Sequence, residues 1–287
     1  MSNRLPAIFC FITCFYCSSI AQNSPVNITN SSTPELPRAR LTLDVPASAN
    51  LDDPAVEVIK KAIKNLGGDK YLKVTSQVGR GKFSLLKDKA VISFQAFVDV
   101  IVFPDKERTE FKGGKGRTIQ VNDGDTGWIY DGEQEKVKDQ DDGQIKNFKQ
   151  GVRTSLDNLL RGGWRGDAEL SYVGKRQASL GKRNEVVKLV YKDGLTVEFE
   201  FAADDGLPVK ATYTRTNADN EEVKEEDRYA QFVDIGGVRT AFIIDRFTNG
   251  SPSSRINYES VEFNKTIPDS WFAKPASPKD AKKEFKN

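Results

Sequence analysis

The chain has 287 residues and carries 43 lysines and arginines against 41 aspartates and glutamates, a formal net charge of +2. Charges so nearly balanced give no electrostatic reason to expect a nucleic-acid partner. The chain has no histidine, which excludes the Ser-His-Asp triad, the Cys–His pair and the usual zinc, copper and haem sites. We therefore expect a non-catalytic protein with no metal and no cofactor.

Residues 1–21 have the pattern of a secretory signal peptide. A positive residue precedes an apolar run from Leu5 to Cys17, and Ser19-Ile20-Ala21 places small residues before the expected cleavage site. This order directs export, and the run is shorter than the roughly 20 residues that span a bilayer. All three cysteines and the only methionine lie within this segment. The mature protein is therefore expected in the periplasm or outside the cell, without disulfides and not spanning the membrane.

The remaining chain divides by composition into three parts. Residues 22–51 are rich in Asn, Ser, Thr and Pro, which predicts a flexible polar tether because they bury too little apolar surface to offset the entropy of ordering. Residues 52–275 are long enough for one large domain with a substantial core. Residues 276–287 form a charged tail, which we expect to fray from Lys279 onward.

Two segments have helical spacing. In the first, an Asx cap at Asp53 and a proline at Pro54 precede an apolar stripe that ends at Gly67-Gly68, which predicts a helix. The second runs from Gln144 to Arg161 as one expected helix. Its apolar positions are Ile145, Phe148, Val152, Leu156, Leu159 and Leu160.

Most of the other periodic segments alternate as strands do. The predicted strands are 92–102, 186–191, 195–201, 209–215, 228–235, 238–247 and 256–263. In the last one the apolar phase slips between Tyr258 and Val261, which indicates a bulge. Tight Asp-Gly and Asn-Gly turns between strands favour an antiparallel meander. The fold class we expect is mainly β with α: a curved antiparallel sheet, or open half-barrel, with helices covering the concave face.

Acidic clusters are the remaining route to chemistry. Two carboxylates suffice for glycoside hydrolysis, and Glu198 and Glu200 share one strand face near the acidic run 221–227. We interpret them as solvated charges on the outer side of a sheet. Asp123 and the run 139–142 lack the spacing of a calcium loop and are better explained as turn residues.

The aromatic and aliphatic strand residues leave two interpretations open. They either fill a packed core or line an apolar groove between sheet and helices, a natural place for an acyl chain. The candidate groove residues are Phe94, Val98, Val100, Leu156, Leu159, Leu160, Val197, Phe199, Phe201 and Phe242.

Several segments in order resemble a known family. They are Leu66-Gly67-Gly68, the run 123–132, Gly206-Leu207-Pro208-Val209-Lys210, Gly236-Gly237-Val238-Arg239 and the run 267–275. Together they are similar to the outer-membrane lipoprotein-sorting family, the carriers related to LolA and LolB. The resemblance covers about Asp53 to Pro275. Thr240-Ala241-Phe242 departs from the family's Pro-Phe after Gly-Val.

The resemblance implies a periplasmic half-barrel whose concave face holds a lipid or the acyl chains of a lipoprotein, without a cofactor or catalysis. It also implies an arginine that latches the lid, for which Arg80 and Arg108 are the candidates. The alternative is an envelope scaffold or stress-sensing module that uses the same half-barrel to bind a protein. A carboxylate-dependent hydrolase and a glycosylated secreted protein, the latter from Asn27-Ile28-Thr29 and similar triplets, are the remaining hypotheses.

Overall fold

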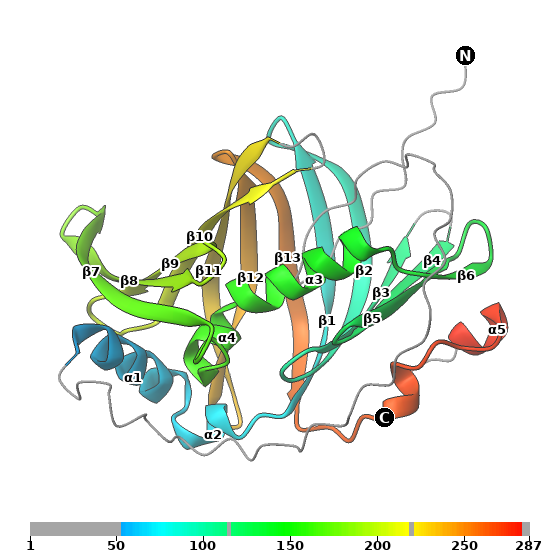
Figure 1. Ribbon diagram of the computed structural model, residues 1–287, viewed down its shortest axis with the longest axis horizontal. Helices are drawn as coiled ribbons and strands as arrows, with labels where there is room; N and C mark the ends of the chain where they lie inside the picture. The colour runs from blue at the N-terminus through cyan, green and yellow to red at the C-terminus, as the bar shows by residue number, and fades with distance from the viewer. Residues whose placement is uncertain (1–52, 114–115, 218–220, 283–287) are drawn as a thin grey trace.

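The computed structural model describes residues 53–113, 116–217 and 221–282. Their backbone forms one antiparallel sheet of 13 strands, which curves without closing and has helices across its inner side (Figure 1). The predicted fold class is confirmed. The predicted signal peptide and tether, residues 1–21 and 22–51, lie outside the described residues.

The strands lie in two meanders that meet in the middle of the sheet. The order across it is β6-β5-β4-β3-β2-β1-β13-β12-β11-β10-β9-β8-β7, so the first strand pairs with the last. The strands are β1 (Ser76–Lys87), β2 (Ala90–Val102), β3 (Lys106–Gly113), β4 (Gly116–Asp123), β5 (Thr126–Asp131), β6 (Lys136–Asp139), β7 (Ala168–Ser179), β8 (Lys182–Tyr191), β9 (Thr196–Ala202), β10 (Pro208–Thr216), β11 (Glu222–Ile235), β12 (Val238–Thr248) and β13 (Ser251–Phe263).

The register confirms the bulge predicted in the last strand. Arg80 pairs with Ser260 and Gly81 pairs with Tyr258, which leaves Glu259 as the extra residue. β11 and β13 begin several residues before their predicted starts. Their first halves are polar, so apolar alternation does not reveal them.

Helix α1 (Pro54–Leu66) confirms the first predicted helix. Asp53 accepts a hydrogen bond from the backbone N–H of Ala55 at 2.9 Å, Pro54 opens the first turn, and Gly67 ends the helix at φ 128°. This positive φ favours glycine. The one-turn helix α2 (Asp69–Leu72) follows.

The second predicted helix is two helices, so the prediction of one continuous helix is wrong. α3 (Asp142–Thr154) and α4 (Leu156–Arg161) are separated by Ser155, whose backbone is extended at φ −71° and ψ 150°. The Ser155 hydroxyl accepts a hydrogen bond from the backbone N–H of Asn158 at 3.1 Å. Serine therefore caps a new helix instead of continuing the old one.

Register assigns each strand residue to one of two faces. We call the face that carries α1, α3 and α4 the concave face, and the opposite one the outer face. On the concave face, α1 and α4 cover an apolar cluster on β8, β9 and β10. A second cluster, on β1, β2, β3 and β13, continues the apolar surface along the same face.

The C-terminal segment, residues 264–282, covers the outer face of β1 to β6. It contains the short helices η1 (Asp269–Trp271) and α5 (Pro278–Ala281). Phe272 and Ala281 are buried against Val78, Val100 and the neighbouring strands. The expectation that the chain frays from Lys279 is wrong for the part that the structure describes, because α5 packs there. Among the described residues, no helix has the length and apolar character needed to cross a bilayer.

Candidate functional site

The concave face is apolar and deeply buried at the β7 end. Val197, Phe199 and Phe201 alternate along β9, and each is fully buried. Leu159 and Leu160 of α4 pack on them together with the buried stripe of α1. This part of the concave face is a filled core.

The middle of the concave face is aromatic and more open. Phe97 and Phe242 each meet the ring of Tyr258 edge to face, with centroids 5.4 and 6.3 Å apart. The Tyr258 ring lies against Gly79, where an added Cβ would stand 2.4 Å from its Cε1. Phe242 is only partly buried. The other partly buried residues of this aromatic cluster are Leu85, Ile235, Ile244 and Phe263.

A row of buried polar side chains crosses the concave face on β2, β3 and β4. Asp99, Thr109 and Gln120 pair across these strands. The Thr109 hydroxyl lies 2.9 Å from Asp99 Oδ1 and 3.2 Å from Glu107 Oε1, so it stands between two buried carboxyl groups. Burial, followed by the nearby charge of Glu107, raises the pKa of Asp99 well above its usual range. Burial therefore disfavours the charged form of this carboxyl group.

Further charges lie on the same face toward β11 and β12. The Arg246 guanidinium Nε lies 3.5 Å from Asp227 Oδ1. Burial raises the pKa of Asp227, and the charge of Arg246 opposes this shift. In the next row, Glu225 is fully buried and accepts hydrogen bonds from Arg215 at 3.0 Å and Thr248 at 2.8 Å. The concave face thus combines two kinds of surface. We call the apolar cluster on β8, β9 and β10 the apolar floor, and the buried polar side chains on β2 to β4 and on β11 and β12 the polar wall.

Helix α3 crosses in front of the middle strands of the sheet (Figure 1). Lys149 forms an ion pair with Asp125 in the β4–β5 turn. Toward the other end of α3, Arg153 donates to Asp193 in the β8–β9 turn at 2.7 and 2.8 Å and lies 4.1 Å from the centroid of Tyr191. α3 is therefore fastened to both halves of the sheet by exposed charges.

Neither arginine proposed as a lid latch faces α3. Arg80 is on the outer face, where it pairs with Glu262 at 2.9 Å. Arg108 is also on the outer face, with its guanidinium 4.7 Å from the ring centroid of Trp271 and 5.5 Å from that of Trp128. Arg153 fastens the helix instead, and the sequence pattern did not single it out.

The candidate groove residues do not all share one surface. Val197, Phe199, Phe201 and Phe242 are on the concave face, and Leu156, Leu159 and Leu160 lie on α4 above it. Val98 and Val100 point to the outer face under the C-terminal segment, and Phe94 follows them there with 61% of its surface exposed. The ligand-binding role of the whole set stays a prediction.

Part of the acidic cluster is buried, against the expectation of solvated outer charges. Glu200 is on the outer face of β9, yet it is buried. It accepts hydrogen bonds from Arg176 at 2.6 Å and Asn184 at 2.8 Å. Burial acts to raise its pKa, but the bonds from Asn184 and Arg176 and the charge of Lys210 outweigh it and lower the pKa. The neighbouring arginine and lysine side chains thus compensate the buried charge of Glu200, which is consistent with a structural role for this residue.

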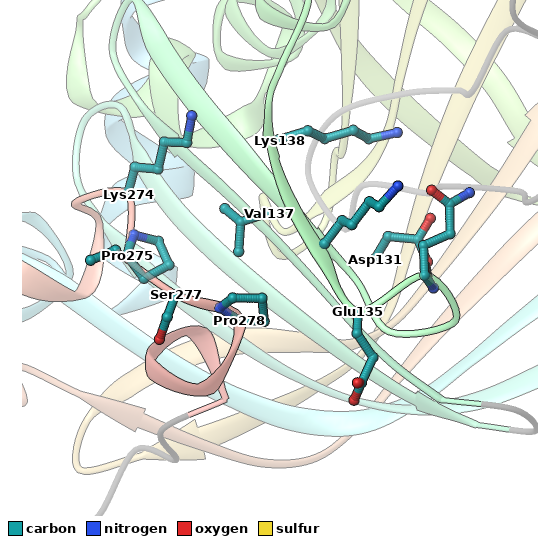
Figure 2. Close-up of a pocket in the computed structure, with 11 residues that line it drawn as sticks. Asp131, Glu135, Val137, Lys138, Lys274, Pro275, Ser277 and Pro278 are labelled. Atoms are coloured by element: carbon teal, nitrogen blue, oxygen red, sulfur yellow. Dashed lines mark hydrogen bonds between the residues drawn. The ribbon is translucent and has the colours of Figure 1, made fainter.

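Two clefts lie outside the concave face. One, of about 400 Å³, lies between the β5–β6 hairpin and the C-terminal segment, where Val137 faces Pro275 and Pro278 while the side chain of Lys138 points away from them (Figure 2). The other, of about 500 Å³, lies over the ends of β9, β10 and β11. No group of three or more metal-ligating side chains occurs in the described ranges.

The fold is that of the LolA-like half-barrels, and comparison with solved structures shows this at low sequence identity. A DUF1329 family protein from Desulfovibrio piger superposes with a TM-score of 0.55 at 12% identity, over 77% of this chain and 98% of that one. A LolA superfamily protein from Nitrosomonas europaea gives a TM-score of 0.52 at 14% identity, over 77% and 97% of the two chains.

A domain described as an outer membrane lipoprotein-sorting protein, from Vibrio parahaemolyticus, gives a TM-score of 0.52 at 11% identity, over 76% of this chain and 97% of that one. No family model matches the sequence, and no curated protein matches it. The similarity to these structures therefore shows the fold.

Proposed function

We propose that this chain is an exported cell-envelope carrier that holds a lipid, or the acyl chains of a lipoprotein, against its concave face. The observation that carries the proposal is the aromatic cluster around Tyr258. It adjoins the buried apolar floor, yet Phe242 and its neighbours remain partly exposed. A concave apolar surface covered by a helix suits an acyl chain. The LolA-like fold of the structures described above supports the same class of function.

The proposal divides the candidate residues by depth. Phe242 contacts the acyl chain, because it is on the concave face and partly exposed. Leu156, on α4 and also partly buried, lies at the edge of the floor. The fully buried residues beneath them hold the surface in shape. Phe94, Val98 and Val100 take no part, since they are on the outer face.

The test is native mass spectrometry of protein purified from a cell envelope, with extraction and identification of bound lipid. The wild type is expected to carry acyl chains. Phe242→Asp is expected to lose most of them, because a charged carboxylate in an apolar site is costly. Phe94→Asp places the same charge on the outer face and is the matched control, which keeps its lipid.

Circular dichroism of both variants shows whether each still folds, and Ile244→Asp repeats the concave substitution at a second position. Lipid-free wild-type protein, or equal lipid loss in the Phe94 and Phe242 variants, would overturn the proposal. Amino-terminal sequencing of the same material tests export, since cleavage of the signal peptide leaves Gln22 first.

One observation favours the scaffold function as the second candidate. Among the described residues, β7 is the last strand of the sheet and pairs with β8 alone, so its other edge is open to an extended peptide. A lipid-free chain whose β7 amides become protected from hydrogen exchange on adding an envelope extract would support this function instead.

A further inference from the structure

The hairpin between β1 and β2 exposes large apolar side chains at its tip. Val91, Ile92 and Phe94 are 59%, 52% and 61% exposed. Leaving side chains of this size in water is unfavourable compared with burying them. A contiguous exposed apolar patch marks an interaction site more often than chance.

Local backbone geometry produces this patch. Asp88 and Lys89 have φ values of 52° and 64°, which form a tight turn between the strands. Next to it, Ser93 pairs with Leu85 and Val91 pairs with Leu86, so Ile92 is an extra residue in β2. This bulge breaks the alternation of the strand. Apolar side chains at consecutive positions therefore reach the surface together.

The C-terminal segment does not cover the tip. On the outer face of β2 it packs on Val98, Val100 and Val102, and Phe94 lies beyond this cover. The Nζ of Lys82 lies 5.9 Å from the centre of the Phe94 ring. The row of apolar side chains on the outer face of β2 thus extends beyond the part that the C-terminal segment covers.

The charges around the tip are mainly positive. Residues 82–94 contain three lysines, Lys82, Lys87 and Lys89, and one acidic residue, Asp88. Lys82 lies 3.8 Å from Glu259, whereas Lys87 and Lys89 stand exposed in the turn. Apolar side chains flanked by lysines match the boundary between acyl chains and anionic headgroups.

We propose that the tip of the β1–β2 hairpin, residues 86–94, docks on an anionic lipid surface, with Val91, Ile92 and Phe94 entering the headgroup boundary. A protein partner fits less well, because stable protein interfaces bury about 1,000 Å² or more and a three-side-chain tip offers a fraction of that area. The inference goes beyond the carrier function, since docking is measurable whether or not the concave face holds lipid.

The test is cosedimentation of the purified chain with vesicles. The wild type is expected to bind vesicles of equal parts phosphatidylcholine and phosphatidylglycerol, and to bind pure phosphatidylcholine vesicles more weakly. Combining Val91→Ser, Ile92→Ser and Phe94→Ser should weaken binding at least roughly tenfold for each side chain. Lys87→Gln and Lys89→Gln should each cost roughly fivefold on the anionic vesicles alone.

Leu180→Ser is the matched control. Leu180 is 97% exposed in the β7–β8 turn, and Lys182 and Arg183 follow it in sequence. This turn therefore also combines an exposed apolar side chain with nearby positive charges, but in a different hairpin. Binding should be unchanged in this variant. Phe94→Trp should show a blue shift in tryptophan emission on anionic vesicles, relative to the wild type, and Leu180→Trp should show none.

The proposal is overturned if the wild type ignores both kinds of vesicle, if the triple serine variant binds like the wild type, or if only the Leu180 variant loses binding. Equal binding to neutral and anionic vesicles overturns the role of the lysines. Native mass spectrometry of the triple variant separates the two proposals: its lipid content should equal that of the wild type, because Phe94 is on the outer face of the sheet and Phe242 is on the concave face.

Discussion

At the scale of single residues, Arg108 shows how the outer face is held together. Its guanidinium pairs with the buried carboxylate of Glu110 at 2.9 Å and donates to the carbonyl oxygens of Trp271 at 3.2 Å and Ala281 at 3.0 Å. One buried side chain therefore joins β3 to both helices of the C-terminal segment.

Replacing Arg108 with leucine should lower the free energy of unfolding by about 3–5 kcal/mol, because it removes one of the two arginine partners of the buried Glu110 carboxylate, the other being Arg117, and leaves the carbonyl oxygens of Trp271 and Ala281 without this donor. Urea denaturation measures the loss, and limited proteolysis should show faster cleavage after Lys274. Arg255→Leu is the control: the Arg255–Asp245 pair is exposed, so the cost should stay below about 1 kcal/mol. Similar losses in both variants would contradict the role assigned to Arg108.

Asp99 predicts a pH dependence of stability. Its pKa in the folded chain is raised by burial and by Glu107, whereas in the unfolded chain it is about 3.9. The folded chain therefore binds the proton more tightly. The stabilising contribution of protonated Asp99 is fully present below the unfolded-state pKa of this residue, and it is lost as pH rises through the folded-state pKa. Asp99→Asn removes this dependence by fixing a neutral side chain.

Urea midpoints of the wild type and Asp99→Asn should coincide near about pH 4 and diverge as pH rises, with the variant the more stable. Asp193 gives the opposite sign, because a hydrogen bond from Arg153 lowers its pKa to about 2. Its contribution is present at neutral pH and is lost as pH falls toward that value. Parallel pH profiles for the wild type and Asp99→Asn would contradict the shift.

At the scale of secondary-structure elements, α3 depends on its two fastenings. Removing them in the double variant Lys149→Ala/Arg153→Ala should raise hydrogen-exchange rates across residues 142–154 roughly tenfold, because exposed pairs contribute about 0.2–1 kcal/mol each. Amides of β9 should be unaffected, since α1 and α4 cover that strand. Lys60→Ala, which breaks an exposed pair within α1, should leave α3 unchanged. An α3 as protected as in the wild type would show that packing alone holds it.

The elements also show what the sequence can and cannot reveal. α1 and the bulge at Glu259 were predictable because caps, apolar stripes and phase slips are local signals. β7 was not, because only Ala168, Leu170 and Tyr172 alternate as apolar positions and the rest of the strand, from Gly174, is polar or small and exposed or nearly so. The break at Ser155 was also missed, since apolar spacing continues on both sides of it.

The sequence analysis was least able to predict which face of the sheet each strand residue points to. Alternation shows that Phe94, Val98 and Val100 share one side, but only the register across every intervening pair shows that this side is opposite to Phe199. The wholly apolar side of β2 is covered by the distant C-terminal segment. Asp99, a charge inside an apolar strand, was the one local signal of the polar wall.

At the scale of the whole molecule, the sheet depends on pairing the ends of the domain. β1 and β13 are neighbours in space although all the other strands of the sheet separate them in sequence. Closing so long a loop costs entropy before the contacts repay it. We therefore expect the two meanders to form first and the β1–β13 pairing to form late in folding.

Two glycines test this order. A Cβ on Gly81 would stand 2.1 Å from the carbonyl oxygen of Asn257 in β13, and a Cβ on Gly132 would stand 2.1 Å from that of Arg117 in β4. Both alanine variants should lose about 1–3 kcal/mol from overpacking. The two variants differ in which contact they disturb: Gly81 and Asn257 are far apart in sequence, whereas Gly132 and Arg117 are close together.

Because late contacts are absent from the transition state, Gly81→Ala should mainly speed unfolding, while Gly132→Ala, in a local meander, should slow the folding of the chain. Stopped-flow folding and unfolding rates over a range of urea concentrations measure both effects. Slower folding in Gly81→Ala, with unfolding unchanged, would mean that the chain pairs its first and last strands at the outset. The meanders would then grow outward from that central pair toward the open edges β6 and β7.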